Sequence, residues 1–484
     1  MGSLSVRVVP VKPGQSSSGD DPAEGRRAPF HGTVVGNYAQ MSQNLQGVSP
    51  KQQRIADLAK QSPQMGFTSL AYHMDLQWLL EAYRRTRKNG AVGVDGQTSA
   101  DYERDLEGNL RSLLERARSG SYVAPPVRRV HIPKAGSADQ TRPIGIPTLE
   151  DKVLQRAVSM LLEPIYEQDF HPGSYGFRPG RGAHQALEQL RNQMMDSHGG
   201  WIVEVDISKF FDTLDHAHLR EFVRCRVRDG VLLRLIGKWL NAGVMEAGQV
   251  SYPESGSPQG GVISPLLANV YLHYVLDMWF EQEVRPRLKG RAYLIRYADD
   301  FVIGFTEQQD ALRVMDVLPK RFGKYGLTVH PEKTRLVRFV RPPKKDDDSD
   351  GKPESFDLLG FTHHWARSRK GNWVVKRKTA RKRLGRGLRA INEWCRANRH
   401  RPLAEQQTGL SQKLRGHCAY YGITGNSVSL QWFRSSLVRL WQKWLNRRNR
   451  ERTMTWERFG RLLARYPLPE AVTVHSSLRP AANP

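Results

Sequence analysis

Two short runs of β-forming residues, Tyr293–Arg296 and Phe301–Phe305, flank the tetrapeptide Tyr-Ala-Asp-Asp at residues 297–300. Such runs, broken by residues with a turn preference, predict a β-hairpin. The tight turn brings Asp299 and Asp300 together, although like charges this close raise each other's pKa. A cation would remove the conflict, since Mg²⁺ binds one or two carboxylates and fills its other positions with water and substrate phosphates. Taken alone, the pair could equally be a solvated turn.

A second acidic strand is predicted at residues 201–207, where apolar and acidic side chains alternate. Asp206 lies inside this apolar strand, and an unpaired buried carboxylate is costly. If the strand neighbours the hairpin in a sheet, Asp206 would converge with Asp299 and Asp300. Two Mg²⁺ ions about 4 Å apart can activate a primer 3′-hydroxyl and stabilise the leaving pyrophosphate, as in polymerases. The pattern therefore predicts a two-metal site.

Blocks along most of the chain resemble those of reverse transcriptases encoded by bacterial and organellar group II introns. The block around the hairpin is Arg296–Phe301. The others are, in chain order, Gly90–Gly96, Arg129–Lys134, Arg142–Pro147, Ser174–Gly180, Gly256–Leu266, Glu332–Thr334 and Leu358–Phe361. Their order and rough spacing agree with the family from about residue 80 to 450, so the combination is specific although no single block is.

The resemblance implies an α+β fold, a right-hand polymerase. Fingers and palm would occupy residues 61–365, with the catalytic acids on an antiparallel sheet, and an all-helical basic thumb, called domain X in the family, would occupy 366–450. Residues 1–60 are expected to be a disordered extension, because Pro13–Arg27 lacks large apolar residues. Residues 451–484 would be a short basic tail that could be a remnant of a DNA-binding domain.

The resemblance assigns the metal chemistry to four positions. Asp206 and Asp299 would be the main ligands, Asp300 would complete the catalytic acids, and Ile207 would join the metal-binding set. Two Mg²⁺ ions are expected, and Mn²⁺ could substitute for them. The implied reaction is RNA-templated extension of a DNA primer by deoxynucleotides, with release of pyrophosphate.

The same resemblance assigns the incoming nucleotide to four other residues. Lys134 and Arg142 would contact the triphosphate, since cations neutralise charge that builds on phosphoryl oxygens. Phe211 would lie under the sugar and exclude a 2′-hydroxyl, and Gln259 would sit near the nucleotide and the template. The alternatives are ordinary surface charge for the basic residues, a core position for Phe211 and a plain loop around Gln259.

Basic residues are concentrated toward the C-terminus. The chain has 74 Lys and Arg against 48 Asp and Glu, a net charge of +26. Residues 367–465 alone hold 26 basic and four acidic residues, so this fifth of the chain supplies +22. An excess of this kind is typical of polyanion binding. Seven of the 11 tryptophans, at 365, 373, 394, 432, 441, 444 and 456, are interleaved with it, and some could stack on bases.

Helical periodicity predicts that this basic region is a bundle whose tryptophans are mostly core. Helices are expected around residues 381–396, 410–421 and 430–448, with another at 456–465. Basic residues off the apolar stripes are the candidates for nucleic-acid binding: Arg381, Arg386, Arg389, Arg434, Lys443, Arg447 and Arg448. The resemblance implies that the region binds intron RNA and promotes its splicing, the maturase activity. The alternative is a thumb that holds only the primer–template duplex.

Composition excludes other classes of protein. No run approaches 18 apolar residues, so no transmembrane helix is expected. The three scattered cysteines support neither a disulfide scaffold nor a zinc site. We expect a bacterial cytoplasmic protein, associated with the nucleoid when it acts on DNA. Many relatives end in an HNH-type nuclease with paired cysteines and histidines, and none is expected here because His475 is the only such residue after Tyr466.

The expected partners are a group II intron RNA, an RNA template with a DNA primer, dNTPs and target DNA. Two other functions stay open. One is a related reverse transcriptase used in defence or repair without an intron. The other is an RNA-binding splicing factor with an inactive polymerase, against which Asp206, Asp299 and Asp300 argue because a passive binder does not need three converging acids.

Overall fold

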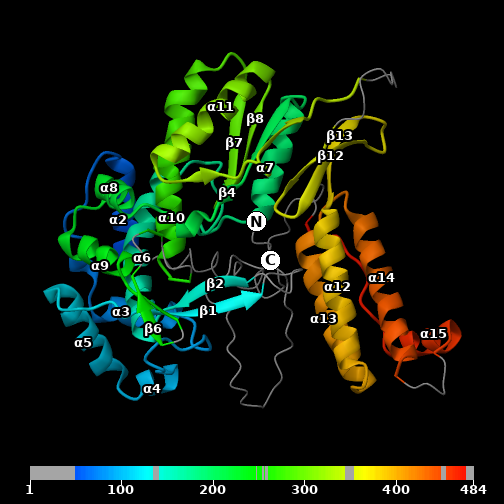
Figure 1. Ribbon diagram of the computed structural model, residues 1–484, viewed down its shortest axis with the longest axis horizontal. Coiled ribbons are helices and arrows are strands. Elements are labelled where there is room, and N and C mark those ends of the chain that lie inside the picture. The colour runs from blue at the N-terminus through cyan, green and yellow to red at the C-terminus, as the bar shows by residue number, and fades with distance from the viewer. Residues whose placement is uncertain are drawn as a thin grey trace.

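The computed structural model describes residues 50–133, 141–246, 248–252, 255–256, 260–343, 354–448 and 454–475. It has the predicted α+β class. Figure 1 shows the hand-like arrangement, with a helical fingers region and the β1–β2 ribbon on one side, the palm sheet above, and the thumb helices α12–α14 on the other side. Among the described residues, no helix is both long and apolar enough to cross a membrane.

The fingers region is a helical layer with a small sheet. Its helices are α2 (Pro50–Gln61), α3 (Leu76–Arg85), α4 (Ser99–Glu103), α5 (Leu106–Ser119), α6 (Leu149–Asp169), α8 (His216–Arg226) and α9 (Gly230–Leu240). Its strands β1 (Val127–Pro133), β2 (Thr141–Ile146), β5 (Val244–Glu246) and β6 (Gln249–Ser251) lie in the order β2-β1-β5-β6. The helix α6 starts at Thr148, whose side chain accepts a hydrogen bond from the Asp151 N–H, and is buried along most of its length.

The folded region begins earlier than the sequence predicts. Disorder is expected up to residue 60, but α2 buries Ile55 and Ala59, and the Gln52 side chain donates to the Met160 carbonyl at 2.9 Å. Two apolar residues four apart on one helical face are enough to anchor an otherwise polar helix. Residues 1–49 lie outside the described residues.

The palm is an antiparallel sheet in the order β10-β3-β8-β7. Its strands are β3 (Trp201–Val205), β7 (Ala292–Tyr297), β8 (Asp300–Phe305) and β10 (Arg335–Arg338), and β4 (Ile207–Ser208) pairs with β9 (Thr328–Val329) beside it. Val203 and Val205 point into a core shared with α10 (Ser264–Leu272) and α11 (Gln308–Lys324). Ile202 and Val302 face the opposite core, which α7 (Ala183–Asp196) covers. Alternate residues of β3 therefore point into two different cores, one on each face of the palm sheet.

The boundary between palm and thumb corrects the prediction. Residue 366, the expected start of an all-helical thumb, lies inside β12 (Phe361–Arg367), which forms a three-stranded antiparallel sheet with β11 (Phe356–Leu358) and β13 (Trp373–Thr379). The basic composition of β13 hides its strand character, because Arg377 is buried and its guanidinium pairs with Glu188 at 2.8 Å. The predicted boundary at residue 366 therefore placed a partly buried strand in the all-helical thumb.

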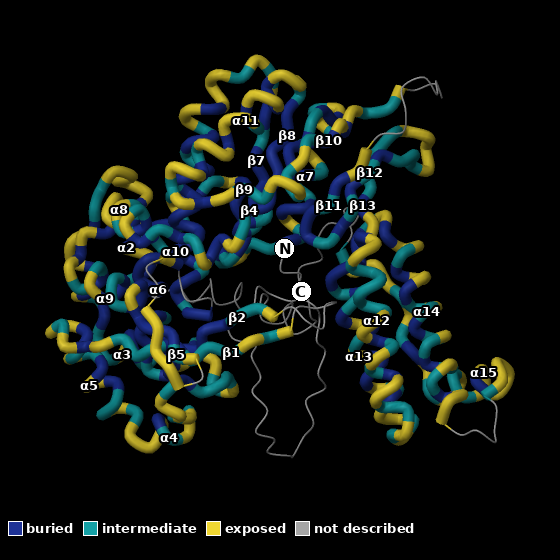
Figure 2. The backbone as a smooth tube through the Cα atoms, in the orientation of Figure 1, coloured by how far each residue is buried: buried dark blue, intermediate teal, exposed yellow. Residues whose placement is uncertain are grey.

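The thumb itself is helical, as predicted. Its helices are α12 (Arg381–Asn398), α13 (Leu403–Tyr421), α14 (Ser427–Asn446) and α15 (Trp456–Arg465). Figure 2 shows that these helices bury their facing sides and expose the others. The expected stripes are in the core, with Ile391, Cys395, Leu437 and Trp441 all buried.

The C-terminal segment returns from the thumb to the palm. The backbone N–H groups of Val474 and His475 both donate to the Gly422 carbonyl, at 2.7 and 2.8 Å. The His475 ring stacks on the ring of His184 from α7, with centroids 3.7 Å apart. The tail expected at 451–484 thus includes a segment that joins thumb and palm.

Candidate active site

The predicted hairpin is present. Strands β7 and β8 pair up to Tyr297 opposite Asp300, which leaves Ala298 and Asp299 as a two-residue turn. Ala298 is buried and has a φ of +57°, a left-handed conformation that glycine adopts readily and other residues seldom do. Such strain persists only where the surrounding structure enforces it.

One part of that surrounding structure is the segment from Gly173 to Gly176. The Arg296 N–H donates to the Gly173 carbonyl, and the Tyr175 N–H donates to the Arg296 carbonyl, both at 2.8 Å. A Cβ added at Gly176 would lie 2.3 Å from the Ala298 backbone nitrogen. Only glycine therefore fits at residue 176, which lies against the turn that carries Asp299.

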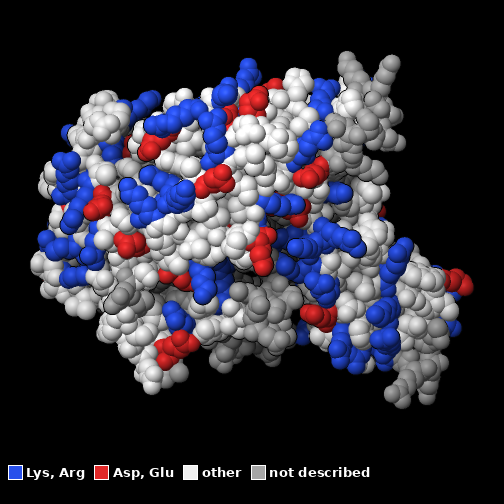
Figure 3. All heavy atoms as spheres, turned by 45° about the horizontal axis from the view of Figure 1, so that its top comes forward, with Lys and Arg blue, Asp and Glu red and all other residues white. Residues whose placement is uncertain are grey.

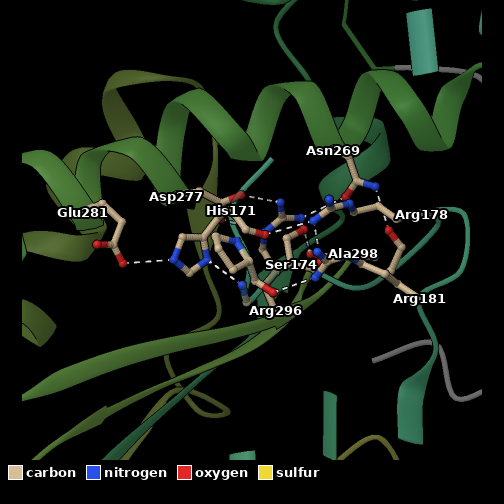
Figure 4. Close-up of polar contacts among 12 residues, drawn as sticks. His171, Ser174, Arg178, Arg181, Asn269, Asp277, Glu281, Arg296 and Ala298 are labelled. Carbon is tan, nitrogen blue, oxygen red and sulfur yellow. Dashed lines mark hydrogen bonds and ion pairs between the residues drawn. The ribbon is translucent and has the colours of Figure 1, made fainter. Parts of the chain in front are cut away.

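The second part is a buried polar network around Arg296, shown in Figure 4. The Arg296 side chain is inaccessible to solvent, and its Nε and Nη2 donate to the two carboxylate oxygens of Asp277 at 2.9 and 2.6 Å. Its Nη1 donates to the Asn269 side chain at 3.0 Å and to the Ala298 carbonyl at 3.1 Å. Asn269 in turn donates to the Gly176 carbonyl at 2.7 Å. The network ties the turn to α10 and to the π-helical turn η4 (His273–Asp277).

Sequence reasoning gave Arg296, Asp277 and Asn269 no role. A signal was present, since an arginine inside an apolar strand and an Asn and an Asp inside the apolar run after Ser264 each require a buried partner. The sequence alone does not say that they are one another's partners.

Asp206 follows β3 directly, and β3 pairs with β8 in a register that ends with Val205 opposite Phe301. The next position places Asp206 beside Asp300, so the predicted juxtaposition of the two acidic strands is present. The Lys333 Nζ lies 3.0 Å from the Asp206 carboxylate, and the His330 N–H donates to the Asp206 carbonyl at 2.8 Å. The block Glu332–Thr334 is therefore adjacent to the first catalytic acid.

Glu204, the other acid of this strand, has a different environment. Arg335 on the neighbouring β10 donates to the Glu204 carboxylate at 2.8 Å. Burial raises the pKa of Glu204 above its ordinary value, although the hydrogen bond and charge of Arg335 oppose the shift. Glu204 is thus held in an ion pair with Arg335 across the palm sheet.

The three predicted catalytic acids are at the ends of neighbouring strands. Asp206 and Asp299 are buried and Asp300 is half-buried. Over the described residues, no three His, Cys, Asp or Glu side chains are gathered closely enough to form a metal-binding group. Carboxylate oxygens at adjoining strand ends are nevertheless the donors that Mg²⁺ selects, with water and phosphates completing its shell. The donor set therefore fits Mg²⁺, with two or three carboxylates contributing.

Three of the remaining predicted polymerase residues lie on three different elements. Ile207 is buried in β4, and its backbone pairs with Val329. Arg142 lies partly exposed on β2 of the ribbon. Phe211 is buried in the short helix η3 (Phe210–Asp212), its ring edge-on to Phe210 at 5.3 Å. Lys134 and Gln259 lie outside the described residues.

Three of the predicted nucleic-acid-binding residues come together. Arg381, Arg386 and Arg389 on α12 line a single pocket with Trp432 of α14. Figure 3 shows that Lys and Arg predominate on the visible surface of the thumb, where Asp and Glu are sparse.

The other four lie elsewhere on α14 and just after it. Arg434 donates to the Pro469 carbonyl and to Glu470, both at 3.0 Å, so it fastens the C-terminal segment. Lys443 and Arg447 flank the Trp444 ring at 5.7 and 5.2 Å. Arg448 donates to the His400 carbonyl at 3.3 Å. These contacts give each residue a structural role beside any role in binding.

Known proteins are similar to this chain in sequence. The family described as reverse transcriptase (RNA-dependent DNA polymerase) matches residues 132–363. Protein YkfC of Escherichia coli K12 is 36% identical over 301 residues, which cover 55% of this chain and 78% of that protein. The group II intron-encoded protein LtrA of Lactococcus lactis is 38% identical over 215 residues, 43% of this chain and 35% of LtrA. Nuclear intron maturase 4 of Arabidopsis thaliana is 29% identical over 254 residues, 49% of this chain and 30% of that protein. The chain thus spans about a third of the length of these two intron proteins.

Proposed function

Because this chain belongs to the family of group II intron-encoded reverse transcriptases, we propose that it copies RNA into DNA by extending a primer with deoxynucleotides. The observation that carries the proposal is the juxtaposition of Asp206, at the end of β3, with the turn that presents Asp299 and Asp300. Neutral side chains would serve as well if these strand ends had only a structural role.

In the proposed reaction, Asp206, Asp299 and Asp300 hold two Mg²⁺ ions, which when bound activate the primer 3′-hydroxyl and stabilise the leaving pyrophosphate. Lys333 leaves the Asp206 carboxylate as the site fills, which frees an oxygen ligand. Arg142, with Lys134, neutralises the triphosphate. Phe211 lies beneath the sugar and Gln259 beside the template. Arg296 keeps the turn in its left-handed conformation throughout.

We further propose that the thumb binds the intron RNA and promotes its splicing and mobility, while the RNA supplies the chemistry of splicing. The basic excess of residues 367–465 supports this role, because phosphate contacts dominate the affinity of such surfaces. The protein would then act in the bacterial cytoplasm, and at the nucleoid when it acts on target DNA.

Primer extension on an RNA template tests the polymerase. Asp299→Ala should abolish DNA synthesis in Mg²⁺ or Mn²⁺ and leave RNA binding at about 150 mM salt unchanged. The matched control is Asp316→Ala, which removes an exposed carboxylate from the surface of α11 and should leave synthesis unchanged. Undiminished synthesis by Asp299→Ala would refute the site.

Splicing of an intron-containing precursor RNA tests the maturase role separately. At a Mg²⁺ concentration too low for self-splicing, the wild type and Asp299→Ala should both restore splicing, because the RNA carries that chemistry. An active polymerase that never accelerates splicing of its flanking intron would leave the reverse transcriptase proposal intact and refute the maturase proposal.

A further inference from the structure

A pocket of about 470 Å³ lies on the thumb between α12 and α14. Its lining consists of Arg381, Lys382, Leu384, Gly385, Arg386, Arg389 and Trp432. Four of these residues are cationic and none is acidic. The pocket therefore suits an anionic ligand that also has an apolar or aromatic part.

One arginine of the pocket, Arg386, lacks some of the hydrogen-bond partners that guanidinium groups normally have among the described residues. The Nε and Nη1 of Arg386 are buried and have no hydrogen-bond partner in the described part of the chain. Burial, together with the charges of Arg383 and Arg389, lowers the pKa of Arg386. Arginine nonetheless stays protonated in proteins, so the charge of Arg386 beside the pocket favours an incoming anion.

The aromatic wall of the pocket is an exposed tryptophan ring. Trp432 is 50% exposed, whereas Trp441 on the same helix is fully buried. Val428, one turn before Trp432, is also exposed, so this strip of α14 carries apolar surface beside the basic pocket. A ring presented next to cations is the usual platform for a nucleobase, whose phosphate the cations neutralise.

The floor of the pocket is open. A Cβ added at Gly385 would meet no other atom within 4 Å. No neighbouring helix therefore requires a glycine at residue 385, although glycine is unfavourable in a helix interior. The missing side chain leaves room for a ligand in the pocket.

We propose that this α12–α14 pocket binds one unpaired nucleotide of RNA, its base against Trp432 and its phosphate on Arg386 and Arg389. A base within a duplex is already stacked on its neighbours, so the pocket selects nucleotides of loops, bulges or single strands. The inference rests on the proposed function, because it names the element of the intron RNA that the thumb holds.

The full-length chain with Gly385→Leu provides the sharpest test. This change fills the pocket, keeps every charge and replaces glycine by a better helix former, so the fold should be retained. At about 150 mM salt, it should weaken binding of a single-stranded RNA oligonucleotide at least about fivefold, as loss of one base stack does. Affinity for duplex RNA should not change. Trp432→Ala should behave alike, and Trp432→Phe should retain most of the affinity.

Two further measurements locate the contact. A single 5-bromouridine in the oligonucleotide should cross-link to Trp432 in the wild type, and mass spectrometry should find that adduct missing in Gly385→Leu. Arg386→Gln should lower single-strand affinity more than Arg396→Gln, which removes an exposed arginine of α12 outside the pocket lining.

The outcomes separate the pocket from the polymerase. Equal binding of single-stranded RNA by the wild type and Gly385→Leu, without the Trp432 cross-link, would overturn the pocket. If the wild type bound single-stranded DNA as tightly as single-stranded RNA, and Gly385→Leu weakened both equally, the assignment of the pocket to RNA would be overturned. Failure of the wild type itself to extend a primer, with the pocket results unchanged, would refute the proposed function instead.

Discussion

The guanidinium of Arg296 and the carboxylate of Asp277 form a fully buried ion pair with two hydrogen bonds, adjacent to the turn that carries Asp299. The remaining Arg296 nitrogen donates to the Ala298 carbonyl inside that turn. A buried pair of this kind contributes little net stability, because desolvation offsets its attraction. Its effect is on geometry. Asp277 fixes the position of the Arg296 guanidinium, and the guanidinium donates a hydrogen bond to the carbonyl of Ala298, the left-handed residue of the turn.

Asp277→Asn should lower the free energy of unfolding by about 3–5 kcal/mol, because it leaves Arg296 charged and buried without its counterion. Thermal or urea unfolding measures the loss. Primer extension should fall together with stability, so this variant alone does not separate folding from positioning.

The double variant Arg296→Met with Asp277→Leu separates them. Replacing a buried ion pair by apolar residues of similar volume is often neutral for stability, so the unfolding free energy should return close to that of the wild type. Primer extension should stay low, because the Ala298 carbonyl has lost its donor. Recovery of both quantities would show that the Arg296–Ala298 hydrogen bond is dispensable.

Gly176→Ala should reduce primer extension strongly, because its methyl group would lie 2.3 Å from the Ala298 nitrogen and must displace the catalytic turn. Gly323→Ala is the opposite case, since nothing lies within 4 Å of its added Cβ and it sits within α11. That variant should be fully active and up to about 1 kcal/mol more stable. Steady-state extension rates and melting temperatures of both proteins test the contrast, which equal activities would contradict.

Lys333→Gln should bind the divalent cation more tightly, by up to about fivefold, because the metal no longer displaces an ammonium from Asp206. Binding of Mn²⁺ followed by electron paramagnetic resonance reports this without requiring catalysis. Lys320→Gln on the exposed side of α11 controls for the loss of one positive charge. A matching shift in both variants would point to a general field effect.

The thumb should be sensitive to acid through His417. Its ring stacks on Phe433 with centroids 3.6 Å apart, and burial lowers the pKa of His417 to about 3. An unfolded histidine takes up a proton near pH 6.5, so below that pH the unfolded state binds a proton that the folded state does not. Stability is therefore lost as the pH falls from 6.5 toward 3, by about 2 kcal/mol at pH 5 for this residue.

His417→Phe should remove that contribution while keeping the stacked ring. The difference in melting temperature between pH 7.5 and pH 5 should be smaller in the variant than in the wild type. An unchanged difference would mean that His417 already has a normal pKa in the folded protein.

The hairpin and its acids were predictable because their signal is local. Tyr297–Asp300 breaks two β-forming runs, and Asp206 ends an alternating strand, so short-range pattern and turn chemistry suffice. The residues that hold the turn were not predictable, since Asp277 lies 19 positions before Arg296 on another element. Such a pair is formed only when the fold brings a helix against a strand.

The thumb illustrates the opposite error. Its helices follow from 3.6-residue periodicity, but the strand β13 was concealed by Lys376, Arg377 and Lys378. Composition indicated an exposed basic region, whereas Arg377 is buried because Glu188 on α7 neutralises it. A charge that acquires a tertiary partner cannot be recognised from its neighbours in sequence.

The small sheet β11–β13 determines where the thumb of another protein could be fused to this palm. Glu188 of α7 contacts Arg377 of β13, and the Nε2 of His184 on the same helix donates to the Tyr420 carbonyl at 2.8 Å. An exchange made at the first thumb helix would separate His184 from Tyr420 and pair a foreign bundle with a resident sheet. A donor thumb should therefore bring its own equivalent of residues 354–379, and the palm that receives it must match at the face of α7 that carries His184 and Glu188.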